Sequence, residues 1–171
     1  MHDGTAELLA AQDGDPRAFE RFVILTHPDI TRFCRYLNGD EDVDDLVQDT
    51  YLRALRSLGT YRHDAPATRW LLGIARRVCA DAVEQRQRHR RPAPLTSIDT
   101  TADDTSLVEL RDLLQAIDPS QRQAFVLTQL LGLSYDDTAG VCGCATGTIR
   151  SRVARARHHL SQLIDTAHRI A

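Results

Sequence analysis

Apolar residues recur at helical spacing along almost the whole chain of 171 residues, and this periodicity constrains the fold most strongly. One apolar run begins at Phe19, just after Asp15-Pro16, where a capping residue precedes the residue that favours a first helical turn. Pro28 interrupts the run, which resumes at Ile30 and stops at Asn38-Gly39. No pair of alternating strand-like segments occurs. The sequence therefore predicts an all-α fold.

The later helices fall into two groups separated by a change in composition. Residues 92–105, PAPLTSIDTTADDT, lack periodicity and are typical of a linker. When fully extended, its roughly fourteen residues would span about 46–50 Å. We expect two small helical domains, residues 1–91 and 106–171, joined by this flexible tether. The further helices are expected at roughly 42–58, 66–88, 106–116, 119–131, 135–142 and 146–168.

Composition limits the setting in which the chain works. The N-terminus lacks the basic start and apolar run of a signal peptide, and no apolar stretch is long enough for a membrane segment. The four cysteines, Cys34, Cys79, Cys142 and Cys144, do not form the pattern of a disulfide framework. We therefore expect a soluble, cytoplasmic protein in a reducing compartment.

The segment GLSYDDTAGVCGCATGTIRSRVARAR has the features of a helix-turn-helix. Ser134 and Asp137 form a capping-box pattern, Gly143 suits the turn, and Thr146 is expected to cap the next helix. That helix should bury a narrow stripe of Ile149, Val153, Ala156 and Leu160. Its remaining surface carries the residues expected to enter a major groove: Thr148, Arg150, Ser151, Arg152 and Arg155.

Two features of this segment also have interpretations other than DNA binding. A run of arginines in a chain of net charge −3 could be a solvated basic face, but the cap and the turn glycine favour a DNA reader. Cys142 and Cys144 could bind metal with His158 and His159, yet the spacing matches no common site. We expect the two cysteines to pack at the turn, and no bound metal.

The stretch DEDVDDLVQDTYLRALRSL, residues 40–58, carries the opposite charge. Its expected inward face is Val43, Leu46, Val47, Thr50, Tyr51, Ala54, Leu55 and Leu58. Its expected outward face is Asp45, Gln48, Asp49 and Leu52. Acidic residues at a helix start favour the helix dipole, which explains some of the charge but not the outward leucine. An apolar centre with a charged rim indicates a protein-binding surface.

The next segment combines an aromatic loop with a basic helix. Leu71, Ile74, Ala75, Val78 and Ala82 form its expected buried stripe, and Trp70 is expected to anchor the core. Arg69, Arg76 and Arg77 share another face. The loop over residues 61–68 contains Tyr61 and His63 and could receive an unstacked base.

Together, DVDDLVQDTYLRAL, TRWLLGIARRVCAD and the 117–157 segment resemble an extracytoplasmic-function sigma factor of bacterial RNA polymerase, and VCGC with GTIRSRVARAR is similar to the sigma-C type. The resemblance implies that the outward face of residues 45–52 docks on the polymerase clamp helices. It implies that loop 61–68 captures a flipped −10 base and that −10 DNA contacts Tyr61, His63, Arg69, Arg76 and Arg77. It implies that Thr148, Arg150, Ser151, Arg152 and Arg155 read the −35 element.

The same resemblance implies promoter DNA and core RNA polymerase, through its clamp helices and flap, as partners. It leaves an anti-sigma factor open, and implies no catalytic residue and no cofactor. Two positions depart from the family pattern: Arg77 replaces a frequent asparagine, and Thr138 replaces a usual aliphatic residue. The alternative is a stand-alone helix-turn-helix regulator. A nucleic-acid enzyme is disfavoured, because the sequence has no Gly-rich phosphate loop, H-E-x-x-H motif or activated nucleophile.

Overall fold

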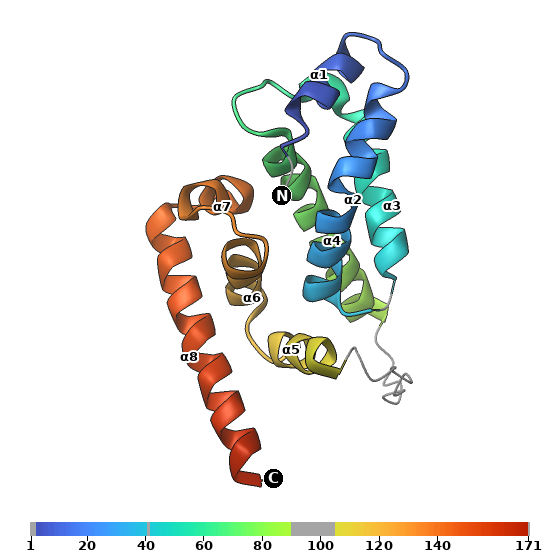
Figure 1. Ribbon diagram of the computed structural model, residues 1–171. Helices are drawn as coiled ribbons and strands as arrows, with labels where there is room; N and C mark the ends of the chain where they lie inside the picture. The colour runs from blue at the N-terminus through green and yellow to red at the C-terminus, as the bar shows by residue number, and fades with distance from the viewer. Residues whose placement is uncertain (1–2, 41, 90–104, 171) are drawn as a thin grey trace.

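The computed structural model describes residues 3–40, 42–89 and 105–170, and within these ranges it contains helices and no strand (Figure 1). The expected linker falls almost wholly outside the described residues, since only Thr105 of it is described. In chain order the helices are α1 (Thr5–Gln12), α2 (Ala18–Asn38), α3 (Val43–Arg56), η1 (Leu58–Thr60), α4 (Ala67–His89), α5 (Thr105–Gln115), α6 (Pro119–Phe125), η2 (Val126–Leu130, a π-helical turn), α7 (Tyr135–Cys142) and α8 (Thr146–Ile170).

The expected interruption at Pro28 is wrong, because α2 continues through it from Ala18 to Asn38. Proline removes the N–H that would bond to the carbonyl of Ile24 and crowds that carbonyl, but Phe22 and Ile30 on either side of it are fully buried and hold α2 against the core. Ile24 is 67% exposed, so water can hydrate that carbonyl. The start signal is close to correct: the Asp15 carboxylate accepts a hydrogen bond from the Arg17 N–H at 2.9 Å.

Helices α2, α3 and α4 pack against one another, and α1 lies across α2 and α4 (Figure 1). The expected stripes of α3 and α4 are largely buried, with one error on α3. Leu55 was expected to face inward, but its side chain is 50% exposed. The core is instead completed by Leu72 and Cys79 on α4, which the simple stripe omitted. Trp70 is half-buried and lies against Tyr61, with ring centroids 5.5 Å apart.

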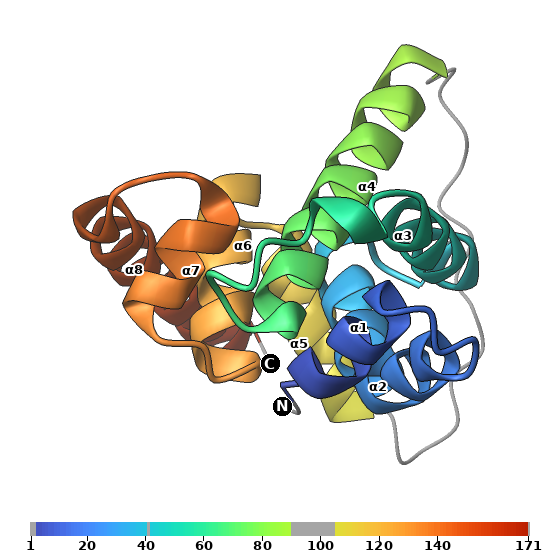
Figure 2. The same ribbon diagram turned by 90° about the horizontal axis from the view of Figure 1, so that it is seen from above.

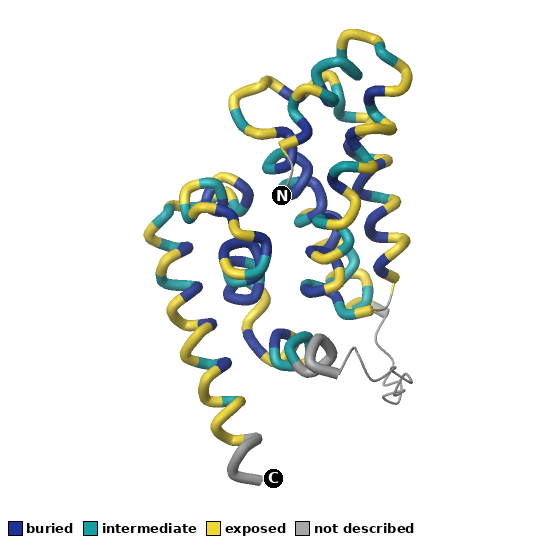
Figure 3. The backbone as a smooth tube through the Cα atoms, in the orientation of Figure 1, coloured by how far each residue is buried: buried dark blue, intermediate teal, exposed yellow. Residues whose placement is uncertain are grey.

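The C-terminal helices form a second group in which α6 and α7 both pack on α8. Figure 3 shows buried positions of α8 on the side that faces α6. Asp118 caps α6, because its carboxylate accepts hydrogen bonds from the N–H groups of Ser120 and Gln121, and Pro119 occupies the first turn. A further hydrogen bond, donated by the Ser120 hydroxyl, is the main cause that lowers the pKa of Asp118.

The two groups of helices contact each other directly. Helix α2 contacts α5, α6 and η2, and α4 lies beside α7, as the view from above shows (Figure 2). The Arg122 side chain of α6 is buried and donates a 2.7 Å hydrogen bond to the carbonyl of Leu37 near the end of α2. Burial lowers the pKa of Arg122. Arg32 of α2 donates in the other direction, to the carbonyl of Leu130, at 3.2 Å. One hydrophobic cluster therefore runs through both groups, from Leu8 to Leu160.

Candidate functional site

The helix-turn-helix is built by the local signals that the sequence contains. Ser134 caps α7, because its hydroxyl accepts a 3.0 Å hydrogen bond from the Asp137 N–H. Gly143 ends α7 in the left-handed region, with φ 64°, where a side chain would be strained. Thr146 does not cap α8 as expected. Its hydroxyl donates a 2.6 Å hydrogen bond to the Asp136 carboxylate, which links the two helices instead.

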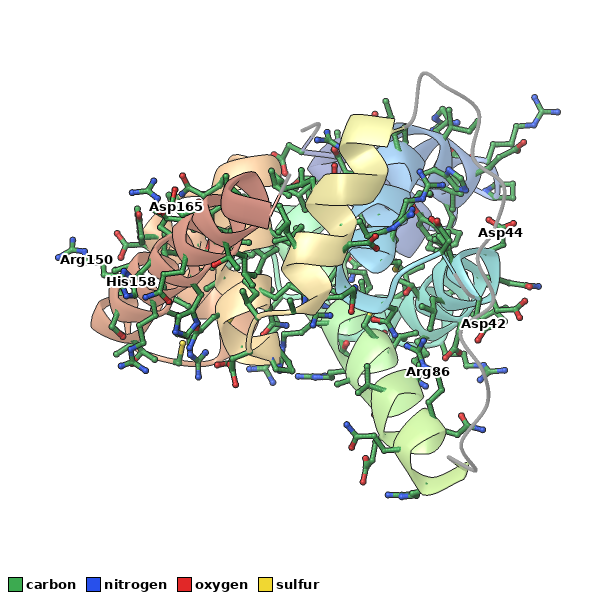
Figure 4. All side chains as sticks on the ribbon, turned by 90° about the horizontal axis from the view of Figure 1, so that it is seen from below. Asp42, Asp44, Arg86, Arg150, His158 and Asp165 are labelled. Carbon is green, nitrogen blue, oxygen red and sulfur yellow. The ribbon has the colours of Figure 1, made fainter. Side chains whose placement is uncertain are left out.

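Helix α8 has the two faces that its sequence predicts. Ile149, Val153, Ala156 and Leu160 are buried, which confirms the inward stripe. The five candidate −35 residues lie outside it: Arg150 and Arg155 are exposed, and Thr148, Ser151 and Arg152 are half-buried. Figure 4 shows Arg150 pointing away from the rest of the molecule, and His158 is also exposed. The outer surface of α8 therefore presents guanidinium groups where a polyanion can reach them.

The two cysteines at the turn behave as packing residues. Cys142 and Cys144 are half-buried, and Arg152 donates a hydrogen bond to the Cys144 sulfur at 3.7 Å. Burial raises the pKa of Cys142 to about 11, so this thiol stays protonated at neutral pH and is a poor nucleophile or metal ligand. Among the described residues no group of three or more metal-ligating side chains comes together.

The acidic face of α3 is exposed in the way its sequence predicts. Asp45 and Gln48 are exposed, Asp49 is half-buried, and the Leu52 side chain is 43% exposed. Beside this face runs an open groove between α2 and α3, lined by Phe19, His27, Asp44, Val47, Gln48, Tyr51, Leu52 and Leu55. The α2 side of this groove, Phe19 and His27, was not predicted, because sequence periodicity does not reveal which flanks of two helices adjoin.

Arg53 connects the acidic face of α3 to α4. Its guanidinium lies 2.9 Å from the Asp49 carboxylate and donates a 2.7 Å hydrogen bond to the carboxylate of Asp81 on α4. Hydrogen bonds to Asp81 and then to Asp49 raise the pKa of Arg53. Asp49 is therefore held in place by an arginine that also contacts the basic helix.

The loop before α4 makes contacts within itself that the sequence does not reveal. Tyr61 is only 4% exposed, and its hydroxyl donates a 2.5 Å hydrogen bond to the Ala65 carbonyl. Its ring lies close to those of His63 and Trp70, at centroid distances of 5.1 Å and 5.5 Å. His63 is exposed and has a left-handed backbone, φ 62°. Tyr61 thus shapes the loop, and His63 is the aromatic side chain that the loop presents to solvent.

The three arginines of α4 differ in their surroundings. Arg77 is exposed. Arg69 is half-buried and forms a 2.9 Å ion pair with Asp137 of α7. Arg76 is also half-buried, and its Nε has no hydrogen-bond partner in the part of the chain that the structure describes. The basic face of α4 is therefore partly covered by the helix-turn-helix.

One helical group carries an acidic and apolar face, and the other carries a helix-turn-helix with exposed arginines. Family comparisons identify the class. The sigma-70 region 2 family matches residues 22–89, and the sigma-70 region 4 family matches residues 107–160. The chain is 45% identical over 163 residues to the ECF RNA polymerase sigma factor SigC of Mycobacterium tuberculosis, covering 91% of this chain and 88% of SigC.

Further relatives agree. Identity to the ECF RNA polymerase sigma factor SigM of Mycobacterium tuberculosis is 38% over 165 residues, covering 93% of this chain and 84% of SigM. The chain therefore belongs to the ECF RNA polymerase sigma factors, which confirms the resemblance read from its motifs. Membership favours this class over the stand-alone regulator.

Solved structures show the same arrangement of helices. CnrH, in complex with the cytosolic domain of CnrY, matches with a TM-score of 0.79 and 28% identity, covering 96% of this chain and 99% of CnrH. RpoE of Bartonella quintana, in complex with the anti-sigma factor NepR, matches with a TM-score of 0.70 and 30% identity, covering 87% and 98%. No helix in the described ranges is long and apolar enough to cross a membrane.

Proposed function

We propose that this chain is the promoter-specificity subunit that binds core RNA polymerase and directs transcription initiation from −10 and −35 elements. The observation that carries the proposal is the separation of two charged surfaces on one chain. Figure 4 places Asp42 and Asp44, at the start of α3, on the opposite side of the molecule from Arg150 of α8. An acidic surface for the enzyme and a basic surface for DNA are the two contacts that such a subunit needs.

The polymerase contact is assigned to Asp45, Gln48, Asp49 and Leu52. Their side chains point away from the core that the opposite face of α3 builds. Leu52 supplies an apolar contact surrounded by carboxylates, and the groove that begins at Leu52 and Leu55 extends it towards α2. A basic, amphipathic partner such as the clamp helices fits this combination. The flap is the second polymerase contact of the proposal, on the C-terminal group of helices.

The promoter contacts are divided between the two groups of helices. The loop of residues 61–68 and the arginines Arg69, Arg76 and Arg77 are assigned to the opened −10 element. The exposed arginines of α8, with Thr148, Ser151 and Arg152 beside them, are assigned to the −35 duplex. The corresponding domain limits are 1–91 and 106–171, with 92–105 as the connection between them.

The remaining assignments follow from this role. The chain itself is not an enzyme, because the polymerase performs the chemistry, and it works in the cytoplasm, where polymerase and promoter are found. An anti-sigma factor is proposed as a further partner. RpoE was captured with the anti-sigma factor NepR, and CnrH with the cytosolic domain of CnrY; these two matches cover 87% and 96% of this chain.

Charge reversal at Asp49 tests the polymerase contact. Asp49→Arg should reduce co-purification with core RNA polymerase at least about tenfold, because it places like charges against the partner and against Arg53. Asp13→Arg, an equal change of charge at an exposed residue just after α1 and outside every assigned contact surface, is the matched control and should bind normally. Circular dichroism verifies that both variants fold. Normal recovery of polymerase with Asp49→Arg would remove the docking assignment.

A further inference from the structure

Helix α1 lies outside the sigma-70 region 2 match yet bonds to both ends of the proposed base-capturing loop (Figure 1). Thr5 and Gln12 are seven residues apart, about two helical turns, so they share one face of α1. At the end of the loop, the Thr5 hydroxyl accepts a 3.1 Å hydrogen bond from the Ala67 N–H. At its start, the Gln12 amide nitrogen donates to the carbonyls of Leu58 and Tyr61, at 2.8 Å and 3.0 Å.

The position of α1 is itself fixed by packing. Leu8 is fully buried in the core. Gly4 has φ 64° and passes so close to α2 that a Cβ there would lie 2.8 Å from the Phe22 ring. This turn directs the Asp3 carbonyl to Thr68, whose hydroxyl donates to it at 2.8 Å. Helix α1 is therefore held firmly in the core and fixes both ends of the loop.

Gln12 also determines which atom of His63 carries a proton. Its amide nitrogen faces two carbonyls, so its Oε1 must face the His63 ring, where it lies 2.7 Å from Nε2. An amide oxygen can only accept, and Nε2 must therefore donate. In the neutral ring, Nδ1 is then an acceptor. Nothing among the described residues hydrogen-bonds to Nδ1, and the side chain is exposed.

We propose that Gln12 is a positioning residue that holds His63 with Nδ1 as an acceptor, so that the loop selects a base with an amino group at the matching edge. Adenine N6 and cytosine N4 are donors there, whereas guanine and thymine have a carbonyl oxygen. This inference rests on the proposed capture of a −10 base by residues 61–68. It adds to that role a residue of α1 and a chemical rule for the captured base.

The test uses the full chain assembled with its own core RNA polymerase, and fork-junction DNA carrying a promoter that the holoenzyme transcribes. Each cytosine and adenine of the −10 non-template strand is exchanged in turn for uracil or hypoxanthine, which replaces the amino group by a carbonyl. At one position the wild-type holoenzyme should lose about threefold to tenfold in affinity, the effect of one hydrogen bond. Gln12→Ala should reduce that ratio towards one.

Controls separate positioning from stability. Glu7→Ala changes another side chain of α1 that contacts neither end of the loop in any described hydrogen bond, and should keep the wild-type ratio. A merely destabilised protein would lower binding to all templates alike and leave the ratio unchanged. His63→Ala, at an exposed residue, should abolish the ratio as well, and it decides the question if Gln12→Ala does not fold.

The outcomes are distinct. If wild-type holoenzyme does not bind the −10 strand at all, the proposed function fails. If it binds but tolerates every exchange, prefers the carbonyl bases, or keeps its selectivity in a folded Gln12 variant or in the His63 variant, the inference is overturned while the proposed function stands.

Discussion

The arginines of α8 and those of α4 are both assigned to promoter DNA, but the structure treats them differently. Arg150 and Arg155 of α8 are exposed on a helix whose other face is buried. On α4, Arg69 is already paired with Asp137 of α7, and Arg76 is half-buried beneath the same group of helices. A guanidinium that is paired with a carboxylate is partly neutralised and has fewer N–H groups left for a phosphate. The arginines of α8 are therefore free to bind DNA, whereas on α4 DNA has to compete with Asp137 of α7 for Arg69.

The largest expected effect concerns the exposed arginines of α8. Arg150→Ala should weaken binding of the holoenzyme by about 1–3 kcal/mol if Arg150 reads a base, and the loss should be confined to one −35 position. Binding to a set of −35 variants, measured at fixed salt, separates this from a phosphate contact, which would weaken every sequence alike. Unchanged binding to all −35 variants would contradict the assignment of α8.

A smaller effect is expected in α7, the helix between the two surfaces. Thr138 is fully buried, and its hydroxyl has no hydrogen-bond partner among the described residues. Thr138→Val keeps the shape and removes the unpaired hydroxyl, so it should raise the free energy of unfolding by about 1 kcal/mol. Urea denaturation measures this. Thr128→Val is the control, since the Thr128 hydroxyl bonds to the Ala124 carbonyl at 2.8 Å and its loss should give no such gain.

The smallest effect should come from freeing the covered arginine. Asp137→Asn removes the charge that holds Arg69, and should strengthen binding of the holoenzyme to −10 fork-junction DNA by up to about fivefold, as expected for a partly exposed ion pair. The neighbouring Asp136→Asn removes an equal charge from the side of α7 that contacts Thr146 of α8. An equal gain in both variants would mean that net charge, and not release of Arg69, is responsible.

The faces of single helices were predictable from sequence, and the contacts between helices were not. Periodicity gave the buried stripe of α8 and the exposed Leu52 of α3, because burial repeats with the helical turn. It also led to the wrong interruption at Pro28, because packing of the buried residues on both sides keeps α2 continuous there. The pairing of Arg69 with Asp137 joins residues 68 positions apart, which no local pattern encodes.

The loop and its support show the same limit. Tyr61 was expected to contact a base, and the structure buries its side chain against Trp70. Its contact with DNA stays a prediction. Helix α1 has only eight residues and was not predicted at all. Its hydrogen bonds to residues 58–68 depend on how the chain folds back, a relation that spacing along the sequence cannot supply.

The continuous apolar interior between the two groups of helices bears on how the halves behave apart. The residues of α2 and α4 that contact α5, α6, η2 and α7 are screened from water only while both halves are present. If the chain were cut within residues 92–105 and the halves separated, each half would expose to water the apolar surface that it now buries against the other. Such halves should reassociate or self-associate, and any partner that separates them has to cover the apolar surfaces that become exposed.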